Sequence, residues 1–178
     1  MISPNWEIHI VATLYVADEG NSTITTTDAS GNPVTSLISD PLAGLQKWVR
    51  VGWVWQLEYV LQAGLHLNEP ENVPGYPVPT FTTGLRNMTG RVNGDGTVTL
   101  FAITAQTSTI SGGEPDPIRL VMITNVLAAT HLPIDDPDHG DGDRDRDDRH
   151  HGSLERFVTL QASRAGEVFR GVAFAPTP

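Results

Sequence analysis

The sequence predicts an all-β fold of antiparallel strands, and three observations support this prediction. Apolar and polar residues alternate with a period of two, most regularly over Trp53–Gln62, which favours a half-buried strand. The 178 residues include 17 Gly and 13 Pro, which indicates many turns and short strands rather than long helices. No segment has convincing helical periodicity, and Ala43–Trp48 is expected to make one helical turn at most.

Two short β-rich segments open the chain. We expect Leu14–Asp18 and Ser22–Asp28 to form a hairpin around Glu19-Gly20-Asn21. The residues Asp28–Pro33, with sequence DASGNP, then form a strong turn signal. Two longer strands are predicted after this turn, at Leu45–Val51 and Trp55–Gln62.

The second half contains the strongest hairpin signal. Asn93-Gly94-Asp95-Gly96 offers residues that tolerate positive φ between two β-rich segments. The proline-rich segment Asn68–Thr80 is predicted to be a loop. The strands expected in this half are Gly84–Asn93, Thr97–Thr104, Ile118–Thr124, Arg156–Ser163 and Phe169–Pro176.

Composition excludes several classes of function. The chain has no Cys, so disulfides, thiolate metal sites and a cysteine nucleophile are excluded. A net charge of −10 without a basic cluster argues against nucleic-acid partners. No apolar run approaches the roughly 20 residues that span a bilayer, so no membrane partner is expected. The first 20 residues lack a basic n-region, so no signal peptide is predicted; the localisation stays open between the cytoplasm and truncation from an exported protein.

The order of strands suggests repeated four-stranded units, which is the construction of a β-propeller blade. About two antiparallel blades fit within residues 1–178, which we treat as a single domain with an incomplete ring. Such a structure leaves open sheet edges, and three interpretations stay open: a fragment with an open pair of sheets, a homo-oligomer that assembles through those edges, or a sandwich-like stack of strands.

Specific segments resemble known propellers. LYVADEGN (Leu14–Asn21) and RGVAFAP (Arg170–Pro176) are similar to blade strands of the NHL-like and gluconolactonase-like families. Gly84–Thr104 and Glu167–Pro176 resemble the C-terminal part of bacterial proteins of this kind, and the resemblance covers about two thirds of the chain. It implies a lactonase-type hydrolase that uses Ca²⁺, held by carboxylates and Asn at strand ends. The positions that carry this role over are Asp18 and Asn87.

An acidic insertion at residues 135–153, DDPDHGDGDRDRDDRHHGS, carries half of the net negative charge. Three interpretations stay open: a solvated insertion, a weak Ca²⁺ site, or a His-based metal or acid–base site. Asp141, Asp143 and Asp145 alternate as at the start of a calcium loop, but the sixth and twelfth positions of an EF-hand are not matched. For zinc, the candidates are His139, His150 and His151.

We therefore expect a Ca²⁺-dependent hydrolase that opens lactone rings, with N-acyl-homoserine lactones among the small-molecule substrates. The metal would polarise the lactone carbonyl while an activated water attacks it. The metal ligands would be Asp141, Asp143, Asp145, Asp147 and Asp18, with His139 or His150 as the base and Asn87 in support. The alternative is a non-catalytic β-propeller segment that acts as a structural or protein-interaction module. A weaker third option is carbohydrate binding by Trp48, Trp53 and Trp55.

Overall fold

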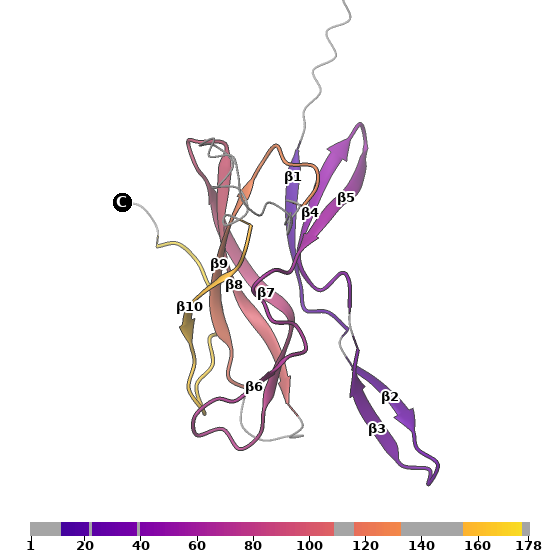
Figure 1. Cartoon of the computed structure of the whole chain (residues 1–178). Coiled ribbons are helices and arrows are strands. Elements are labelled where there is room, and N and C mark those ends of the chain that lie inside the picture. Colours follow the sequence, from indigo (N-terminus) through magenta and orange to yellow (C-terminus); the bar gives the residue numbers. More distant parts are fainter. Residues whose placement is uncertain (1–11, 22, 39, 109–115, 133–154, 176–178) are drawn as a thin grey trace, which may run out of the picture.

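The computed structural model describes residues 12–21, 23–38, 40–108, 116–132 and 155–175, and every regular element within them is a β-strand (Figure 1). The strands are β1 (Thr13–Asp18), β2 (Thr23–Thr27), β3 (Pro33–Leu37), β4 (Gly44–Val51), β5 (Val54–Leu61), β6 (Pro70–Glu71), β7 (Thr80–Val92), β8 (Thr97–Ser108), β9 (Arg119–Val126) and β10 (Val158–Ala162). All of their pairings are antiparallel, so the predicted all-β antiparallel class is confirmed. No helix long and apolar enough to cross a bilayer occurs in the described residues.

The strands form two main sheets and a separate hairpin. One sheet has the order β1-β4-β5, the other has the order β10-β9-β8-β7-β6, and β2 pairs only with β3. Both main sheets are open in the described part of the chain, which is compatible with the expected incomplete propeller-like arrangement. The strands divide into groups of three and five, however, because the short β6 joins the larger sheet and β2 with β3 leaves the smaller one.

The core lies between the two main sheets. Leu45 of β4 and Leu61 of β5 face Leu100 of β8 and Ile123 of β9, and all four side chains are almost completely buried. Strand β9 alternates buried and half-buried residues along its whole length, as a strand with one covered face should. The period-two pattern of the sequence therefore places an apolar face of each sheet against the other.

The predicted orientation of the side chains along β5 is wrong in the first part of the strand. The sequence suggested that the odd-numbered residues from Trp53 to Leu61 all share one face. The ladder with β4 shifts between Lys47 and Trp48, because Glu58 is an extra residue that forms a β-bulge. As a result, Tyr59 and Leu61 face the core, whereas Leu57 faces the other side of the sheet.

The predicted hairpin between the first two strands is also wrong. Strand β1 pairs with β4, and the β2–β3 hairpin lies between them in sequence as an excursion (Figure 1). The carboxylate of Asp40 accepts a hydrogen bond from the backbone N–H of Asn21, which joins the two ends of this excursion. At its tip, the carboxylate of Asp28 accepts hydrogen bonds from the backbone N–H groups of Ser30 and Asn32. The DASGNP turn was therefore predicted correctly, but it joins β2 to β3.

Most strands of the second half follow the prediction. Asn93–Gly96 connects β7 to β8, and the predicted loop Asn68–Thr80 is irregular apart from the two residues of β6 and Thr80, which begins β7. The predicted strand at Phe169–Pro176 is wrong, since its described residues pair with no strand. Instead of extending a sheet, Phe174 packs edge-to-face on Phe101 of β8, with ring centroids 5.6 Å apart. The helical turn considered for Ala43–Trp48 is also not formed, because β4 begins at Gly44.

Candidate functional site

Most of the predicted metal and catalytic residues belong to the acidic insertion. They lie outside the residues that the structure describes, and their roles stay predictions: His139, Asp141, Asp143, Asp145, Asp147, His150 and His151.

The two predicted residues that the structure does describe occupy separate local environments. Asp18 ends β1, and its carboxylate accepts hydrogen bonds from the backbone N–H of Gly20 and the side-chain amide of Gln46. Asn87 is exposed in β7 with φ of 49°, at a shift in the β7–β8 register that marks a bulge. One carboxylate and one amide are far fewer than the six to eight oxygen ligands that Ca²⁺ takes. Further ligands would have to come from outside the described residues.

No cluster of three or more His, Cys, Asp or Glu side chains suited to a metal ion occurs among the described residues. Their polar groups gather instead in two places that the sequence analysis did not single out. One surrounds Arg119 at the edge of the core, and the other surrounds Lys47 between the two sheets.

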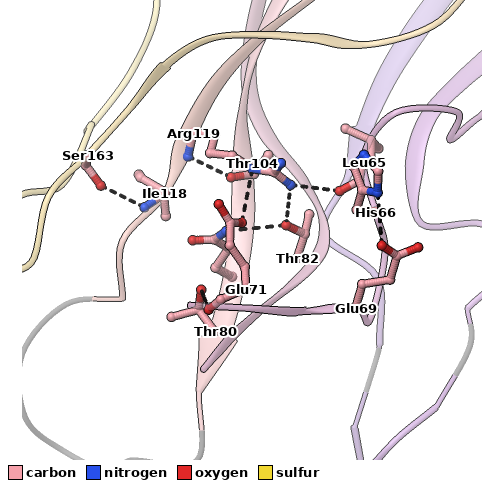
Figure 2. Close-up of polar contacts among 11 residues, drawn as sticks. Leu65, His66, Glu69, Glu71, Thr80, Thr82, Thr104, Ile118, Arg119 and Ser163 are labelled. Carbon is pink, nitrogen blue, oxygen red and sulfur yellow. Dashed lines mark hydrogen bonds and ion pairs between the residues drawn. The ribbon is translucent and has the colours of Figure 1, made fainter. Parts of the chain in front are cut away.

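Arg119 organises the first cluster from the start of β9 (Figure 2). Its guanidinium donates to the carbonyl of Leu65 at 2.8 Å and to the hydroxyl of Thr82 at 2.7 Å. Its Nε lies 3.6 Å from a carboxylate oxygen of Glu71, and its backbone N–H donates to the hydroxyl of Thr104. The side chain of Arg119 therefore joins the loop before β6 to strands β6 and β7, and its backbone N–H adds a contact to β8.

A surface hollow of about 460 Å³ lies beside this cluster, between the loop after β6 and the segment after β10. Glu71, Ser163 and Arg164 contribute polar groups to its lining. The hydroxyl of Ser163 accepts a hydrogen bond from the backbone N–H of Ile118, so this serine is already held by the fold. His66 lies on the other side of Arg119 and contacts only Glu69 among the residues drawn in Figure 2. The hydrogen bonds of Arg119 and Ser163 thus connect the loop before β6 and the segment after β10 to the larger sheet.

Lys47, the only lysine of the chain, is completely buried between the sheets. Its ammonium donates to the backbone carbonyls of Val126 at 2.8 Å and Ala129 at 2.6 Å. It also contacts the hydroxyl of Tyr59 at 3.2 Å. A buried ammonium group is stable only when its hydrogen bonds are satisfied, so these contacts bind β4 to the end of β9 and to the segment that follows it.

Asn125 extends this arrangement across β9. Its amide nitrogen donates to the hydroxyl of Tyr59 at 2.9 Å and to the carboxylate of Glu155 at 2.7 Å. Its amide oxygen accepts a hydrogen bond from the hydroxyl of Tyr15. Together with Lys47, these residues form one buried polar cluster: Tyr15, Lys47, Tyr59, Asn125 and Glu155.

Burial raises the pKa values of the two tyrosines of this cluster and lowers the pKa of its lysine. Burial, helped by the negative charge of Glu155, raises the pKa of Tyr59 to about 12 and also raises the pKa of Tyr15. Burial lowers the pKa of Lys47, although the carboxylates of Glu155 and Glu58 oppose this shift. Burial therefore disfavours the charged form of all three groups, as expected between two apolar sheets.

We expect stability to fall as pH rises from 10 to 12. The raised pKa of Tyr59 makes the folded chain hold a proton that the unfolded chain has lost, so its contribution is complete below pH 10 and disappears above pH 12. A shift of this size corresponds to about 2–3 kcal/mol. Lys47 has the opposite effect on stability. Because its pKa is lowered in the folded chain, the unfolded chain holds more protons at this lysine below pH 10.5, and stability there increases as pH rises. Urea unfolding between pH 8 and 12 measures both slopes; an unchanged alkaline slope in Tyr59→Phe would contradict the assignment.

A different feature lies on the far side of the three-stranded sheet. The bulge at Glu58 and the register of β1, β4 and β5 place a row of apolar side chains on the face that points away from the core, beside Gln46, Arg50 and the half-buried Val60. We use the name outer face for five of these apolar side chains: Leu14, Val16, Trp48, Trp55 and Leu57. Leu14 is 43%, Val16 36% and Trp55 41% exposed, while Trp48 and Leu57 are half-buried.

The turn between β4 and β5 adds exposed apolar side chains at one end of this sheet, which we call the hairpin tip: Val51, Trp53 and Val54. Val51 pairs with Val54 in the phase of Lys47 and Tyr59, so the two valines lie on the opposite face, and Trp53 is the residue of the tip that extends the outer face. Trp53 is 90% exposed, and the guanidinium of Arg50 lies 4.8 Å from its ring centroid. Exposed single hydrophobic residues are ordinary, but a larger group of them, here with Trp48, Trp53 and Trp55, is typical of binding surfaces. The sequence contained this signal in Trp48, Trp53 and Trp55, but only the structure shows that the Glu58 bulge turns Trp55 and Leu57 outward.

Comparison of the chain with protein-family models, with curated proteins and with solved structures finds no match.

Proposed function

We propose that this chain is a non-catalytic, propeller-like β-sheet module that acts by binding another protein through the outer face of the β1-β4-β5 sheet. The observation that carries this proposal is the row of exposed and half-buried apolar side chains on the side of the sheet that points away from the core. Burial of such side chains is the main driving force of protein association.

The β2–β3 hairpin provides an internal comparison. Among its described strand residues, Thr25, Thr26, Thr27 and Ser36 are exposed and carry hydroxyl groups. The outer face instead presents Leu14, Val16 and Trp55 as exposed side chains. This contrast supports a covered role for the outer face rather than ordinary surface variation.

The edges of the three-stranded sheet are less suited to binding than its face. Edge strand β5 contains the Glu58 bulge, a feature that interrupts pairing with a further strand. The other edge strand, β1, ends where the backbone of Asp18 and Glu19 lies against Gly84 of β7. We therefore favour sheet-on-sheet binding over the edge-to-edge association suggested by the sequence.

A photo-reactive benzoyl-phenylalanine at position 55 tests the proposal directly. In the native host, we expect irradiation to join this position to a protein that peptide mass spectrometry identifies, either another copy or a different chain. The matched control is position 92, because Val92 is 69% exposed but lies at the end of β7, away from the outer face. If position 55 gives no adduct beyond those at position 92, the binding role of the outer face is refuted.

The Ca²⁺-dependent lactonase remains a second proposal, supported by the alternating Asp141, Asp143 and Asp145. In that case the purified chain hydrolyses N-acyl-homoserine lactones, EDTA stops the reaction, and added Ca²⁺ restores it. The double variant Asp141→Ala, Asp143→Ala should then lose most activity while keeping its melting temperature. Hydrolysis that ignores both EDTA and these substitutions would exclude the acidic insertion as the metal site.

A further inference from the structure

We infer that the partner at the outer face is a second copy of this chain, which docks the opposite surface of its own five-stranded sheet there. This inference rests on the proposed function, because it names the occupant of the same outer face. It is carried by a second apolar surface on the chain and by the way the two sheets already pack.

The second surface spans strands β8, β9 and β10. Phe101 of β8 lies opposite Met122 of β9, which lies opposite Val158 of β10, so the three side chains form a row across the sheet. Phe174 packs on Phe101 beside this row. We call these four residues the β9–β10 face; Val158 is 53% and Phe174 47% exposed, and Phe101 and Met122 are half-buried.

The two apolar surfaces lie on opposite sides of the molecule. Figure 1 shows β10 and the C-terminal segment on one side and β1, β4 and β5 on the other. Because they point in opposite directions, one copy cannot bring its own outer face against its own β9–β10 face. Two copies can make this contact if one supplies its outer face and the other supplies its β9–β10 face. Such an interface is heterologous, or head-to-tail.

The core of each copy already contains a contact of this kind. There, the inner face of the three-stranded sheet packs on the inner face of the five-stranded sheet through residues such as Leu45, Leu61, Leu100 and Ile123. The proposed contact places the reverse sides of the same two sheets together in a neighbouring pair of copies. Apolar sheet faces stack in this manner about 10 Å apart.

The exposed apolar area of the outer face is a large part of what a stable interface requires. Leu14, Val16 and Trp55, together with Trp53 of the hairpin tip, expose roughly 450 Å² of apolar side-chain surface. A standard protein interface buries about 800 Å² on each partner. The outer face with Trp53 therefore supplies more than half of one side of such an interface.

Head-to-tail contact has a consequence that a symmetric dimer lacks. Each docked pair still has one free outer face and one free β9–β10 face, so a third copy can bind. Association therefore continues beyond the dimer, and ends only if the repeated rotation closes a ring.

Sedimentation velocity of the purified full chain over a wide range of concentrations tests this inference. We expect wild-type protein to form species larger than a dimer. Trp55→Glu should block the outer face and Val158→Glu the β9–β10 face, each weakening self-association at least about tenfold. Mixing the two variants should restore one intact contact and give a 1:1 complex that grows no further. Val92→Glu, at an exposed valine outside both faces, should associate like wild type.

The outcomes separate this inference from the proposed function. Dimers formed by Val158→Glu alone would show that outer faces pair with each other and would overturn the head-to-tail contact. A wild-type chain that stays monomeric, yet is cross-linked at position 55 to an identified different protein, would overturn only the second-copy inference. Monomers without any position-55 adduct would overturn both. Leu14→Glu provides a second outer-face variant, with circular dichroism and thermal melting to verify folding.

Discussion

Replacing Lys47 with methionine is expected to lower the free energy of unfolding by about 3–5 kcal/mol. Methionine fits the space of the lysine stem but has no hydrogen-bond donor at its end. The carbonyls of Val126 and Ala129 would lose their bonds to the ammonium, and no water can easily reach a side chain that is completely buried. The carboxylate of Glu155 would also lose the nearest cation of the buried polar cluster.

The expected loss is large because only one partner of a buried ionic arrangement is removed. Lys47 is itself disfavoured by burial, as its lowered pKa indicates, so its presence alone adds little stability. Once it is absent, however, the groups around it remain buried and polar. The double variant Lys47→Met, Glu155→Gln should therefore be less unstable than the sum of its two single variants.

Urea unfolding monitored by tryptophan fluorescence measures these differences. Arg91→Met is a suitable control, because Arg91 is an exposed cation on β7 and its replacement should change stability by less than about 0.5 kcal/mol. A Lys47→Met protein within 1 kcal/mol of wild type would show that the buried ammonium is not needed to hold β4 against the segment after β9.

Local signals explain which parts of the fold were predictable. The Asn93–Gly96 turn and the DASGNP turn depend on residues that are adjacent in sequence, and both were located correctly. The partner of β1 depends on contacts between residues far apart, such as Asp40 with Asn21 across the base of the β2–β3 excursion. A pattern of period two identifies a strand but does not identify its neighbour, so the wrong hairpin was predicted.

The candidate site was less predictable for the same reason. Alternation placed Trp55, Leu57, Tyr59 and Leu61 on one face, and the single bulge at Glu58 separates the first two from the last two. The outer face therefore arises from a local irregularity that has no reliable sequence signature. The burial of Lys47 could have been predicted from its position, because it lies two residues after buried Leu45 and so on the same face of β4. Lysine is almost never fully buried, however, so an exposed side chain was the ordinary expectation.

Replacing Gly84 with alanine is expected to lower the free energy of unfolding by about 2–3 kcal/mol, although alanine is ordinarily better than glycine in a strand. A Cβ at this position of β7 would lie 2.2 Å from the backbone oxygen of Asp18 and 2.5 Å from the backbone carbon of Glu19. Backbone atoms cannot rotate away as a side chain can, so β1 would have to move. The ion pair between Arg86 and Glu19, at 3.1 Å, belongs to the same junction and would be disturbed with it.

Gly94→Ala separates this steric effect from the general effect of removing a glycine. Gly94 lies in the β7–β8 turn, and an added Cβ there meets nothing within 4 Å, so a change of at most about 1 kcal/mol is expected. Strand β1 also carries Leu14 and Val16 of the outer face, so a displaced β1 in Gly84→Ala should weaken association as well as stability. Equal stability of the two variants in urea unfolding would mean that β1 can move away from β7 at no cost. The contact at Gly84 would then not be what positions the outer face, since its first strand would be held by β4 alone.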